Sequence, residues 1–439
     1  MIGTGYLGAT HAVCMASLGF EVLGLDVLPE KVEALASGRV PFFEPELEEL
    51  LVEQLASGRL RFTTSFEEVG AFGDVHFVCV GTPQKKGEFA ADLTYVDAAF
   101  DALLPHARAG SLLVGKSTVP VGTAERLAER IAAARGEELG LAWNPEFLRE
   151  GFAVKDTLTP DRLVFGVADG DAGQRAEQQL RAAFAPVIAG PDGQDVPVVV
   201  ADLATAQLVK VAANAFLATK ISFINAMAEV CEATGADVTL LSKALSYDAR
   251  IGGRFLNAGL GFGGGCLPKD IRAFMARAGE LGVDQALSFL KEVDAINLRR
   301  RARMVELARE ELHGSFGGMR VAVLGAAFKP DSDDIRDSPA LDVAAAIQRQ
   351  GAAVNVYDPQ AMDNCRQKHP ELGYRDTALD AAKGADLVLH LTEWQEFRDM
   401  DPAELGEVVE TRRILDGRNA LDPDTWRSAG WTYRALGRP

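Results

Sequence analysis

Two stretches of the 439-residue chain alternate short apolar, β-rich runs with helical stretches. This alternation is typical of parallel strands covered by helices, and it constrains the fold more than any other feature of the sequence. In the first stretch, strands are expected at residues 21–26, 75–80, 111–116, 139–143 and 162–167. In the second stretch, strands are expected at residues 319–325, 352–357, 386–391 and 412–416.

The segment between the two series is predicted to be helical. Residues 203–234 contain neither proline nor glycine and are rich in Ala, Leu, Val and Phe, which indicates one long, largely buried helix. A second helix is predicted at about 288–312. Its basic cluster is expected to form a solvated face, and consists of Arg299, Arg300, Arg301 and Arg303. A surface excursion rich in Gly, Pro and Asp is expected at 189–197.

These elements predict an α/β protein with two Rossmann-like doubly wound domains joined by a long central helix segment. The length also exceeds that of one ordinary core. The predicted parts are an N-terminal Rossmann-like domain at 1–200, a central helical segment at 201–314 and a C-terminal Rossmann-like domain at 315–439.

Composition excludes several classes of partner. The formal net charge of -18 argues against nucleic acid or an anionic membrane as the main partner. No uninterrupted apolar run reaches the roughly 18 residues of a membrane span. The N-terminus lacks the features of a secretory signal. The five cysteines are scattered without a CxxC pair, so we expect neither a disulfide framework nor a metal site, and a cytoplasmic location.

The first turn carries a dinucleotide-binding pattern. Gly3, Gly5 and Gly8 form G-x-G-x-x-G, which permits a tight turn and lets the backbone approach a pyrophosphate. Asp26 ends the next predicted strand, where a carboxylate can accept the ribose hydroxyls of NAD and repel the extra phosphate of NADP. Only Met1 and Ile2 precede Gly3, so either the start lies upstream or the first strand is shortened.

The segment GFGGGCLPKD at 261–270 carries the candidate nucleophile. Three consecutive glycines allow backbone amides to approach a ligand, and Cys266 follows them directly. Pro268 suits the first turn of a helix, whose dipole would favour the cysteine thiolate. The other cysteines are expected to be small buried apolar residues, namely Cys14, Cys79, Cys231 and Cys365.

With these motifs in order, the chain resembles the UDP-glucose/GDP-mannose dehydrogenase family over nearly its full length. The motifs are IGTGYLG with Asp26, GTP at 81–83, STVPVGT at 117–123, NPEFLREG at 144–151, GFGGGCLPKD, AFKPDSDDIRDSP at 327–339 and DGRN at 416–419.

The resemblance implies a four-electron oxidation of a sugar C6 alcohol with NAD, through a thiohemiacetal and a thioester on Cys266. Lys210 and Asn214, four residues apart on one helix face, would then stabilise the oxyanion. Asp270 would orient water or lysine. Thr118 and Glu150 would position the hydrolytic water and assist proton transfer. The product class indicates a role in polysaccharide biosynthesis.

The resemblance also implies an NAD-binding domain at 1–200, a dimerising part with the catalytic cysteine loop at 201–314, and a nucleotide-sugar-binding domain at 315–439. It further implies two sets of binding residues. The cofactor contacts are Gly3, Gly5, Tyr6, Leu7, Gly8, Asp26, Lys31, Thr82, Thr118, Glu150, Lys269 and Arg336. The nucleotide-sugar contacts are Glu146, Phe147, Leu148, Glu150, Lys210, Asn214, Arg250, Phe255, Leu256, Asn257, Ala258, Gly259, Gly263, Phe328, Lys329 and Arg418. Some relatives carry lysine at the position of Asn257. A homodimer is expected, with Arg418 completing the neighbouring site.

The identity of the sugar stays open among several alternatives. UDP-glucose is favoured because RFLNAGLGFGGGCLPKD resembles that branch, and GDP-mannose is the alternative. The branch that oxidises N-acetylated UDP-sugars carries Gly-His-Cys, whereas this chain has Gly-Gly-Cys at 264–266. A hydroxyacid dehydrogenase would not need Cys266, and a catalytically dead nucleotide-binding protein is the remote alternative.

Overall fold

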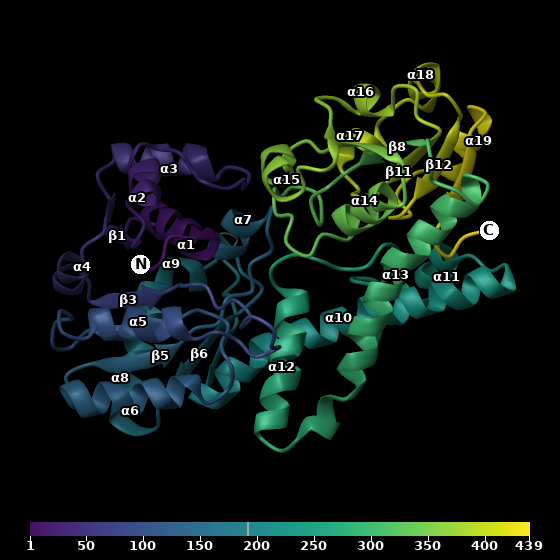
Figure 1. The fold of residues 1–439 in the computed structure, drawn as a ribbon. Helices are drawn as coiled ribbons and strands as arrows, with labels where there is room; N and C mark the ends of the chain where they lie inside the picture. Colours follow the sequence, from purple (N-terminus) through teal and green to yellow (C-terminus); the bar gives the residue numbers. More distant parts are fainter. Residues whose placement is uncertain (191–192) are drawn as a thin grey trace. The chain divides into compact units, whose positions relative to one another are not determined.

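The computed structural model describes residues 1–190 and 193–439, so residues 191–192 of the predicted surface excursion lie outside it. The chain divides into two compact units. The first consists of Met1–Ala213 and Arg272–Gly282, and the second of Asn214–Ile271 and Val283–Pro439. Each unit contains a predominantly parallel sheet with covering helices, which confirms the predicted α/β class (Figure 1).

In the first unit, five strands pair in the order β3-β4-β5-β6-β7, and β1 pairs with β2. All pairings are parallel except that of β5 with β6. The predicted strands are confirmed as β1 Val22–Leu25, β3 Val75–Val78, β4 Leu112–Gly115, β5 Gly140–Trp143 and β6 Leu163–Val167. Two strands were not predicted, β2 Leu60–Thr63 and β7 Val198–Ala201.

Ile2 takes the place of a central strand between β1 and β3. It forms parallel bridges to Leu25 of β1 and to Val78 of β3, and its side chain is 1% exposed. Its amide donates to the carbonyl of Phe77 at 2.8 Å, and its carbonyl accepts from the amide of Cys79 at 2.8 Å. These bridges hold the following glycine turn between β1 and β3.

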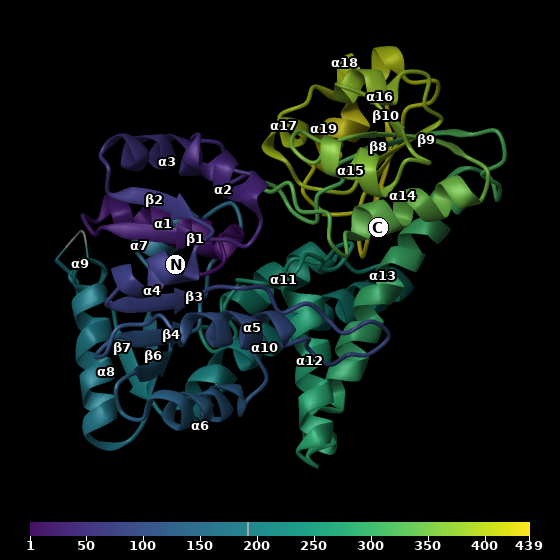
Figure 2. The same cartoon turned by 60° about the vertical axis from the view of Figure 1, so that its left-hand side comes forward.

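Side chains of successive strand residues fill the two faces of this sheet. On β4, Leu113 belongs to one apolar cluster, whereas Leu112 and Val114 belong to the other. The elements around the sheet, drawn from purple to teal in Figure 2, are α1 Tyr6–Ser17, α2 Pro29–Ala36, α3 Leu47–Ala56, α4 Phe66–Phe72, α5 Thr94–Leu103, α6 Thr123–Arg135, α7 Ala153–Leu158, α8 Gly170–Ala183 and α9 Ala185–Ile188.

The second unit contains a six-stranded parallel sheet in the order β10-β9-β8-β11-β12-β13. The predicted strands are confirmed as β8 Arg320–Leu324, β9 Ala353–Tyr357, β11 Leu387–His390 and β12 Arg413–Asp416. The strands β10 Gly373–Tyr374 and β13 Thr432–Ala435 extend the two edges. The helices of this part are α14 Pro339–Arg349, α15 Met362–Lys368, α16 Ala378–Ala382, α17 Gln395–Arg398, α18 Pro402–Val408 and α19 Pro423–Ser428.

Local sequence explains where several of these helices begin. In α14 the side chain of Ser338 accepts a hydrogen bond from the amide of Leu341, and Pro339 is the first helical residue. Asp401 and Asp422 cap α18 and α19 in the same way, each followed by proline. An oxygen-bearing cap satisfies free amides, and proline has no amide to leave unpaired. Ser338 followed by Pro339 therefore fixes the start of α14.

The remaining helices are α10 Leu203–Thr234, α11 Val238–Ser246, α12 Leu267–Glu280 and α13 Phe289–Glu311, with the 3-10 turn Asp284–Leu287 before α13. Both long predicted helices are confirmed. Ser222 of α10 donates to the carbonyl of Val293 on α13 at 2.7 Å. The α10 helix is long and apolar enough to cross a membrane by length and composition, a test that core helices of soluble proteins also pass.

The predicted solvated face of α13 is wrong for two of its four arginines. The side chain of Arg300 is 0% exposed and lies 3.2 Å from Glu232 of α10. The side chain of Arg301 is 7% exposed. The sequence pattern placed these residues in solvent because it did not reveal the acidic partners, which neutralise the buried guanidinium groups. Arg299 is 51% exposed and fits the prediction.

Candidate active site

The turn between Ile2 and α1 contains backbone contacts that only glycine permits. Gly3 has a φ of 85°, in the left-handed region. A Cβ at Gly8 would lie 1.8 Å from the carbonyl oxygen of Gly3. A Cβ at Gly5 would meet nothing within 4 Å, and Gly5 caps α1 without a side-chain hydrogen bond. The space at Gly5 and the N-terminal amides of α1 therefore suit a pyrophosphate.

Asp26 follows β1 beside this turn and is 6% exposed. Its Oδ2 accepts from the amide and the hydroxyl of Thr4 at 3.0 and 3.2 Å, and its Oδ1 accepts from the amide of Leu28 at 3.2 Å. Lys31, another predicted cofactor residue, lies 3.7 Å from Oδ2. This fixed carboxylate can accept ribose hydroxyls, so turn and carboxylate together fit NAD.

Glu44, which the sequence did not indicate, joins the glycine turn to the segment after Glu150. Its carboxylate accepts from the hydroxyl of Tyr6 in the first turn of α1. It also accepts from the amides of Gly151 and Ala153, each at 2.7 Å. Burial, and then the Glu44 carboxylate, raise the pKa of Tyr6, so its hydroxyl stays a donor. The predicted residues Tyr6 and Glu150 thus belong to one connected region.

Two further predicted residues meet after the ends of β3 and β4. The hydroxyl of Thr82 donates to the carbonyl of Thr118 at 2.8 Å. Next to it, the hydroxyl of Ser117 donates to the carbonyl of Val80 at 2.7 Å. The carboxyl ends of parallel strands are the usual place for ligand-binding loops in such sheets.

Lys210 and Glu146 form a buried ion pair in the first unit. Lys210 Nζ lies 2.9 Å from Glu146 Oε1, and the side chains are 7% and 12% exposed. The amide of Leu148 donates to the other oxygen of Glu146 at 2.6 Å, and the Phe147 ring lies 5.7 Å from Nζ. Burial alone would raise the pKa of Glu146, but the charge and hydrogen bond of Lys210 outweigh it and lower the pKa. The Glu146 carboxylate is therefore ionised at neutral pH.

In the second unit, Cys266 is exposed at the start of α12, whereas the other four cysteines are buried as predicted. The carbonyl of Cys266 accepts from the amide of Asp270 at 2.9 Å, as expected for the residue that begins the helix. The helix dipole at this end favours a thiolate.

Asp270 connects two other predicted site residues. It is 2% exposed. Its two oxygens accept from Asn214 Nδ2 and from Lys269 Nζ, each at 2.6 Å. Three site residues of the second unit are thereby joined. Lys210 lies one turn before Asn214 on α10 and pairs with Glu146.

The glycines before Cys266 pack directly against other predicted residues. Gly264 has a φ of 83°, and its Cβ would lie 2.8 Å from the ring of Phe328. A Cβ at Gly265 would lie 2.2 Å from Cζ of Arg336. Lys329 Nζ lies 5.6 Å from the centre of the Phe328 ring. The structure therefore brings residues 261–266, called the nucleophile loop because they carry the candidate nucleophile Cys266, into contact with the segment AFKPDSDDIRDSP.

The segment FLNAG alternates buried and exposed side chains. The side chains of Leu256 and Ala258 are 2% and 5% exposed and pack in an apolar cluster, so only their backbone can face a ligand. The side chains of Phe255 and Asn257 are exposed. A Cβ at Gly259 would lie 2.6 Å from the carbonyl oxygen of Gly417, which explains the glycine.

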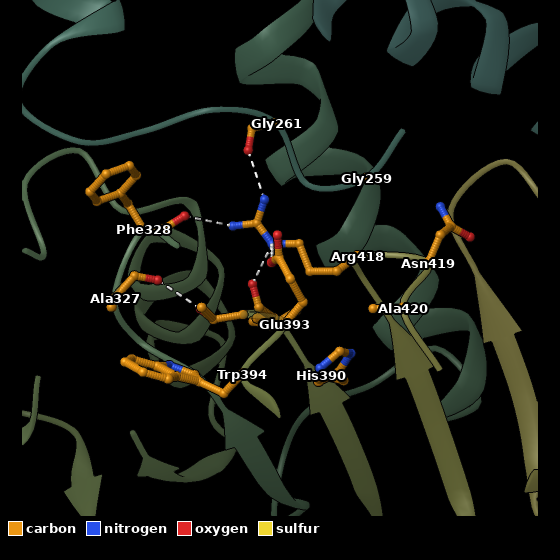
Figure 3. A network of polar contacts seen from close by, with 12 residues as sticks. Gly259, Gly261, Ala327, Phe328, His390, Glu393, Trp394, Arg418, Asn419 and Ala420 are labelled. Carbon is orange, nitrogen blue, oxygen red and sulfur yellow. Dashed lines mark hydrogen bonds and ion pairs between the residues drawn. The ribbon is translucent and has the colours of Figure 1, made fainter. Parts of the chain in front are cut away.

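Arg418 is held within its own unit (Figure 3). Its guanidinium donates to the carbonyls of Leu391, Gly261 and Phe328 at 2.7, 2.9 and 3.1 Å, and lies 3.3 Å from Glu393. Its side chain is 12% exposed. These contacts lie within one copy of the chain, and the predicted role of Arg418 in a neighbouring subunit stays a prediction.

Arg250 has the opposite character. Its side chain is 89% exposed and pairs with Asp248 at 2.6 Å. The sequence marked both arginines as basic residues near the substrate, and only their surroundings separate them. Of the two guanidinium groups, that of Arg250 is the more exposed.

Family models match most of the chain. The model of the NAD binding domain of the UDP-glucose/GDP-mannose dehydrogenase family matches residues 1–185. The central domain of the same family matches residues 204–299, and its UDP binding domain matches residues 322–423.

Individual proteins are similar over their whole length. The chain is 40% identical to the UDP-glucose 6-dehydrogenase of Rhizobium meliloti, covering 100% of this chain and 99% of the relative. It is 37% identical to a UDP-glucose 6-dehydrogenase of Bacillus subtilis, covering 100% and 97%. A solved UDP-glucose dehydrogenase from Pyrobaculum islandicum matches with a TM-score of 0.89 and 38% identity, covering 100% and 97%. A UDP-D-ManNAc dehydrogenase from Pyrococcus horikoshii matches with a TM-score of 0.84 and 27% identity, covering 100% and 98%.

The two glycine positions of the turn predict different outcomes for the same substitution. Gly5→Ala should leave the thermal midpoint close to that of the wild type, because its Cβ meets no atom, but should weaken NAD binding about tenfold or more by filling the pyrophosphate space. Gly8→Ala should lower the midpoint, because its Cβ collides with Gly3. Calorimetric NAD titration and thermal unfolding measure both effects. Wild-type NAD affinity in Gly5→Ala would contradict the assignment of this turn.

Proposed function

The chain belongs to the UDP-glucose/GDP-mannose dehydrogenase family, and from this premise we propose that it oxidises UDP-glucose at C6 to UDP-glucuronate. The relatives named above that carry this activity in their names are 37–40% identical over nearly their full length. Within the chain, the proposal depends on one observation above the others: Cys266 is the exposed cysteine, and it begins a helix.

Cys266 retains the substrate between two oxidations. The C6 alcohol first loses a hydride and a proton to give an aldehyde. The thiolate adds to the aldehyde carbon, and the oxygen takes a proton, which gives a thiohemiacetal. This intermediate loses a second hydride and a proton to give a thioester, and water then releases the carboxylate and the thiol. NAD, when bound, accepts the hydride of each oxidation.

Charged and polar residues on α10 support the developing charge. Lys210 and Asn214 are buried donors four residues apart, and we assign them to the C6 oxygen. Glu146 forms an ion pair with Lys210, and Asp270 accepts a hydrogen bond from the side-chain amide of Asn214. We assign Thr118 and Glu150 to the water that hydrolyses the thioester.

We assign the nucleotide end of the substrate to the second unit. The supporting observation is the close packing of Phe328 against the nucleophile loop, with Lys329 adjacent to it. Arg418 supports this pocket by holding the carbonyls of Gly261 and Phe328. We assign the Lys329 ammonium group to the diphosphate. The match to the family's UDP binding domain at 322–423 supports the same assignment.

The choice of UDP-glucose over other nucleotide sugars is tested by a panel. UDP-glucose should give the highest kcat/KM, with UDP-galactose, GDP-mannose and UDP-N-acetylglucosamine at least about tenfold lower, a difference of about 1.4 kcal/mol. The Gly-Gly-Cys sequence and the relatives' names support UDP-glucose. A higher kcat/KM for GDP-mannose or UDP-N-acetylglucosamine would reassign the substrate.

Replacing the nucleophile should stop turnover without removing the substrate. Cys266→Ser should reduce steady-state NADH formation by about a hundredfold or more, because a serine hydroxyl is a far poorer nucleophile than a thiolate. UDP-glucose affinity, measured by calorimetry, should stay within about threefold. Cys231→Ser is the matched control, since Cys231 is buried in an apolar cluster. Steady-state turnover of Cys266→Ser within tenfold of the wild type would contradict the covalent role.

We further propose that the chain forms a homodimer through α10. Phe216, Phe223 and Val230 lie seven residues apart and are 67%, 48% and 53% exposed. Seven-residue spacing places them on one helix face, and a second copy of the same face is its natural complement in a symmetric dimer. The exposed Arg250 is then the candidate for a contact across the dimer, in place of Arg418.

The scattered cysteines favour a location in the reducing cytoplasm.

Charges on this face should separate the copies. The double variant Phe216→Glu and Phe223→Glu should halve the mass measured by light scattering, because paired carboxylates would be desolvated against each other. Val52→Glu is the control, since Val52 is a 52% exposed apolar residue on α3 of the first unit. A monomeric wild type, or a double variant that keeps the wild-type mass, would contradict the proposal.

A further inference from the structure

The loop that carries Cys266 needs support from outside itself. Four of the five residues between Gly261 and Gly265 are glycine, and glycine has the largest backbone freedom to lose on folding. A nucleophile in such a loop is positioned only if its neighbours fix the backbone. In the second unit, α13 supplies two side chains that contact this loop.

The first side chain is Asn297, which is 0% exposed. Its Oδ1 accepts from the amide of Phe262 at 2.7 Å, and its Nδ2 donates to the carbonyl of Phe262 at 2.9 Å. One amide side chain thus satisfies both backbone groups of a loop residue. A Cβ at Gly261 would lie 2.3 Å from Asn297 Oδ1, so the glycine is required for this contact.

The second side chain is Arg301, one turn further along α13. Its Nη2 donates to the carbonyl of Phe262 at 3.2 Å and to that of Asp337 at 3.3 Å. Its Nη1 donates to the carboxylates of Asp337, at 2.8 Å, and Asp342. The side chain is 7% exposed. Arg301 therefore joins the nucleophile loop to the turn before α14.

The same turn contacts the loop a second time. The amide of Gly264 donates to the carbonyl of Arg336 at 2.8 Å. A Cβ at Gly263 would lie 2.3 Å from the carbonyl oxygen of Asp337. The loop is consequently held at Phe262 by α13 and at Gly263 and Gly264 by the turn, and Arg301 connects the two supports.

We propose that Asn297 and Arg301 are positioning residues for the nucleophile, acting on Cys266 through the backbone of Phe262. The proposal rests on the proposed role of Cys266. A residue that only stabilises the fold would change the midpoint of unfolding, whereas these residues also set the reactivity of the thiolate at the start of α12. Each substitution should therefore change catalysis and Cys266 chemistry, and leave NAD binding unchanged.

The test compares Asn297→Ala, Asn297→Asp and Arg301→Lys with Arg303→Ala. Arg303 is on the same helix and pairs with Glu232 and Glu310 at 2.8 and 3.1 Å, so its loss removes ion pairs of α13 away from the loop contacts given above. Asn297→Asp keeps an acceptor for the amide of Phe262 but cannot donate to its carbonyl. Arg301→Lys keeps the charge and loses the forked geometry.

Two measurements distinguish the positioning role of Asn297 and Arg301 from the proposed oxidation of UDP-glucose. The rate of Cys266 alkylation by iodoacetamide, measured against pH without substrate and corrected with Cys266→Ala, should fall about tenfold in both Asn297 variants, with its midpoint moved to higher pH. The kcat with UDP-glucose should fall about ten- to hundredfold while NAD affinity stays within twofold. For Arg301→Lys, the alkylation rate and kcat should lie between those of the Asn297 variants and those of the wild type. For Arg303→Ala, both should equal the wild-type values.

Equal or faster alkylation in the Asn297 variants would overturn the proposal, as would an equal loss in Arg303→Ala. If Asn297→Ala fails to fold, Asn297→Asp and Arg301→Lys decide the result by the same measurements. If the Asn297 variants are alkylated more slowly but the wild type does not oxidise UDP-glucose, the positioning role stands and the proposed substrate is rejected.

Discussion

The nucleophile loop has no side chain between Gly263 and Cys266, so its conformation depends on the atoms that press against its backbone. Phe328 and Arg336 occupy the positions that a Cβ at Gly264 and Gly265 would need. These contacts fix a segment that would otherwise be the most mobile part of a catalytic site. They also explain how three consecutive glycines can precede the proposed nucleophile while its backbone position stays fixed.

The buried polar side chains of α10 also need fixed positions, and their partners provide them. Lys210 with Glu146, and Asn214 with Asp270, are buried pairs whose hydrogen bonds offset the cost of removing charge from water. A helix without proline or glycine carries both donors, and its rigidity keeps them one turn apart. Removing one partner would leave an unpaired buried group. For a buried ion pair this lowers the free energy of unfolding by about 3–5 kcal/mol.

The sequence predicted every central strand of the two sheets within one or two residues, because buried parallel strands are short apolar runs. It missed the short or edge strands β2, β7, β10 and β13, which have mixed or exposed side chains. It placed Cys266 and Asp270 in one site through motif order. It did not find Asn297 or Glu44, and it placed Arg301 in solvent, because their partners are distant in sequence and no local pattern identifies them.

The central claim is that one site performs two successive oxidations with the sugar held on Cys266. The most direct measurement is the amount of NADH formed from a limiting, accurately known amount of UDP-glucose, with free aldehyde trapped and assayed in parallel. The account predicts two NADH for each UDP-glucose and no trapped aldehyde. One NADH for each sugar, or accumulation of the free aldehyde, would contradict it.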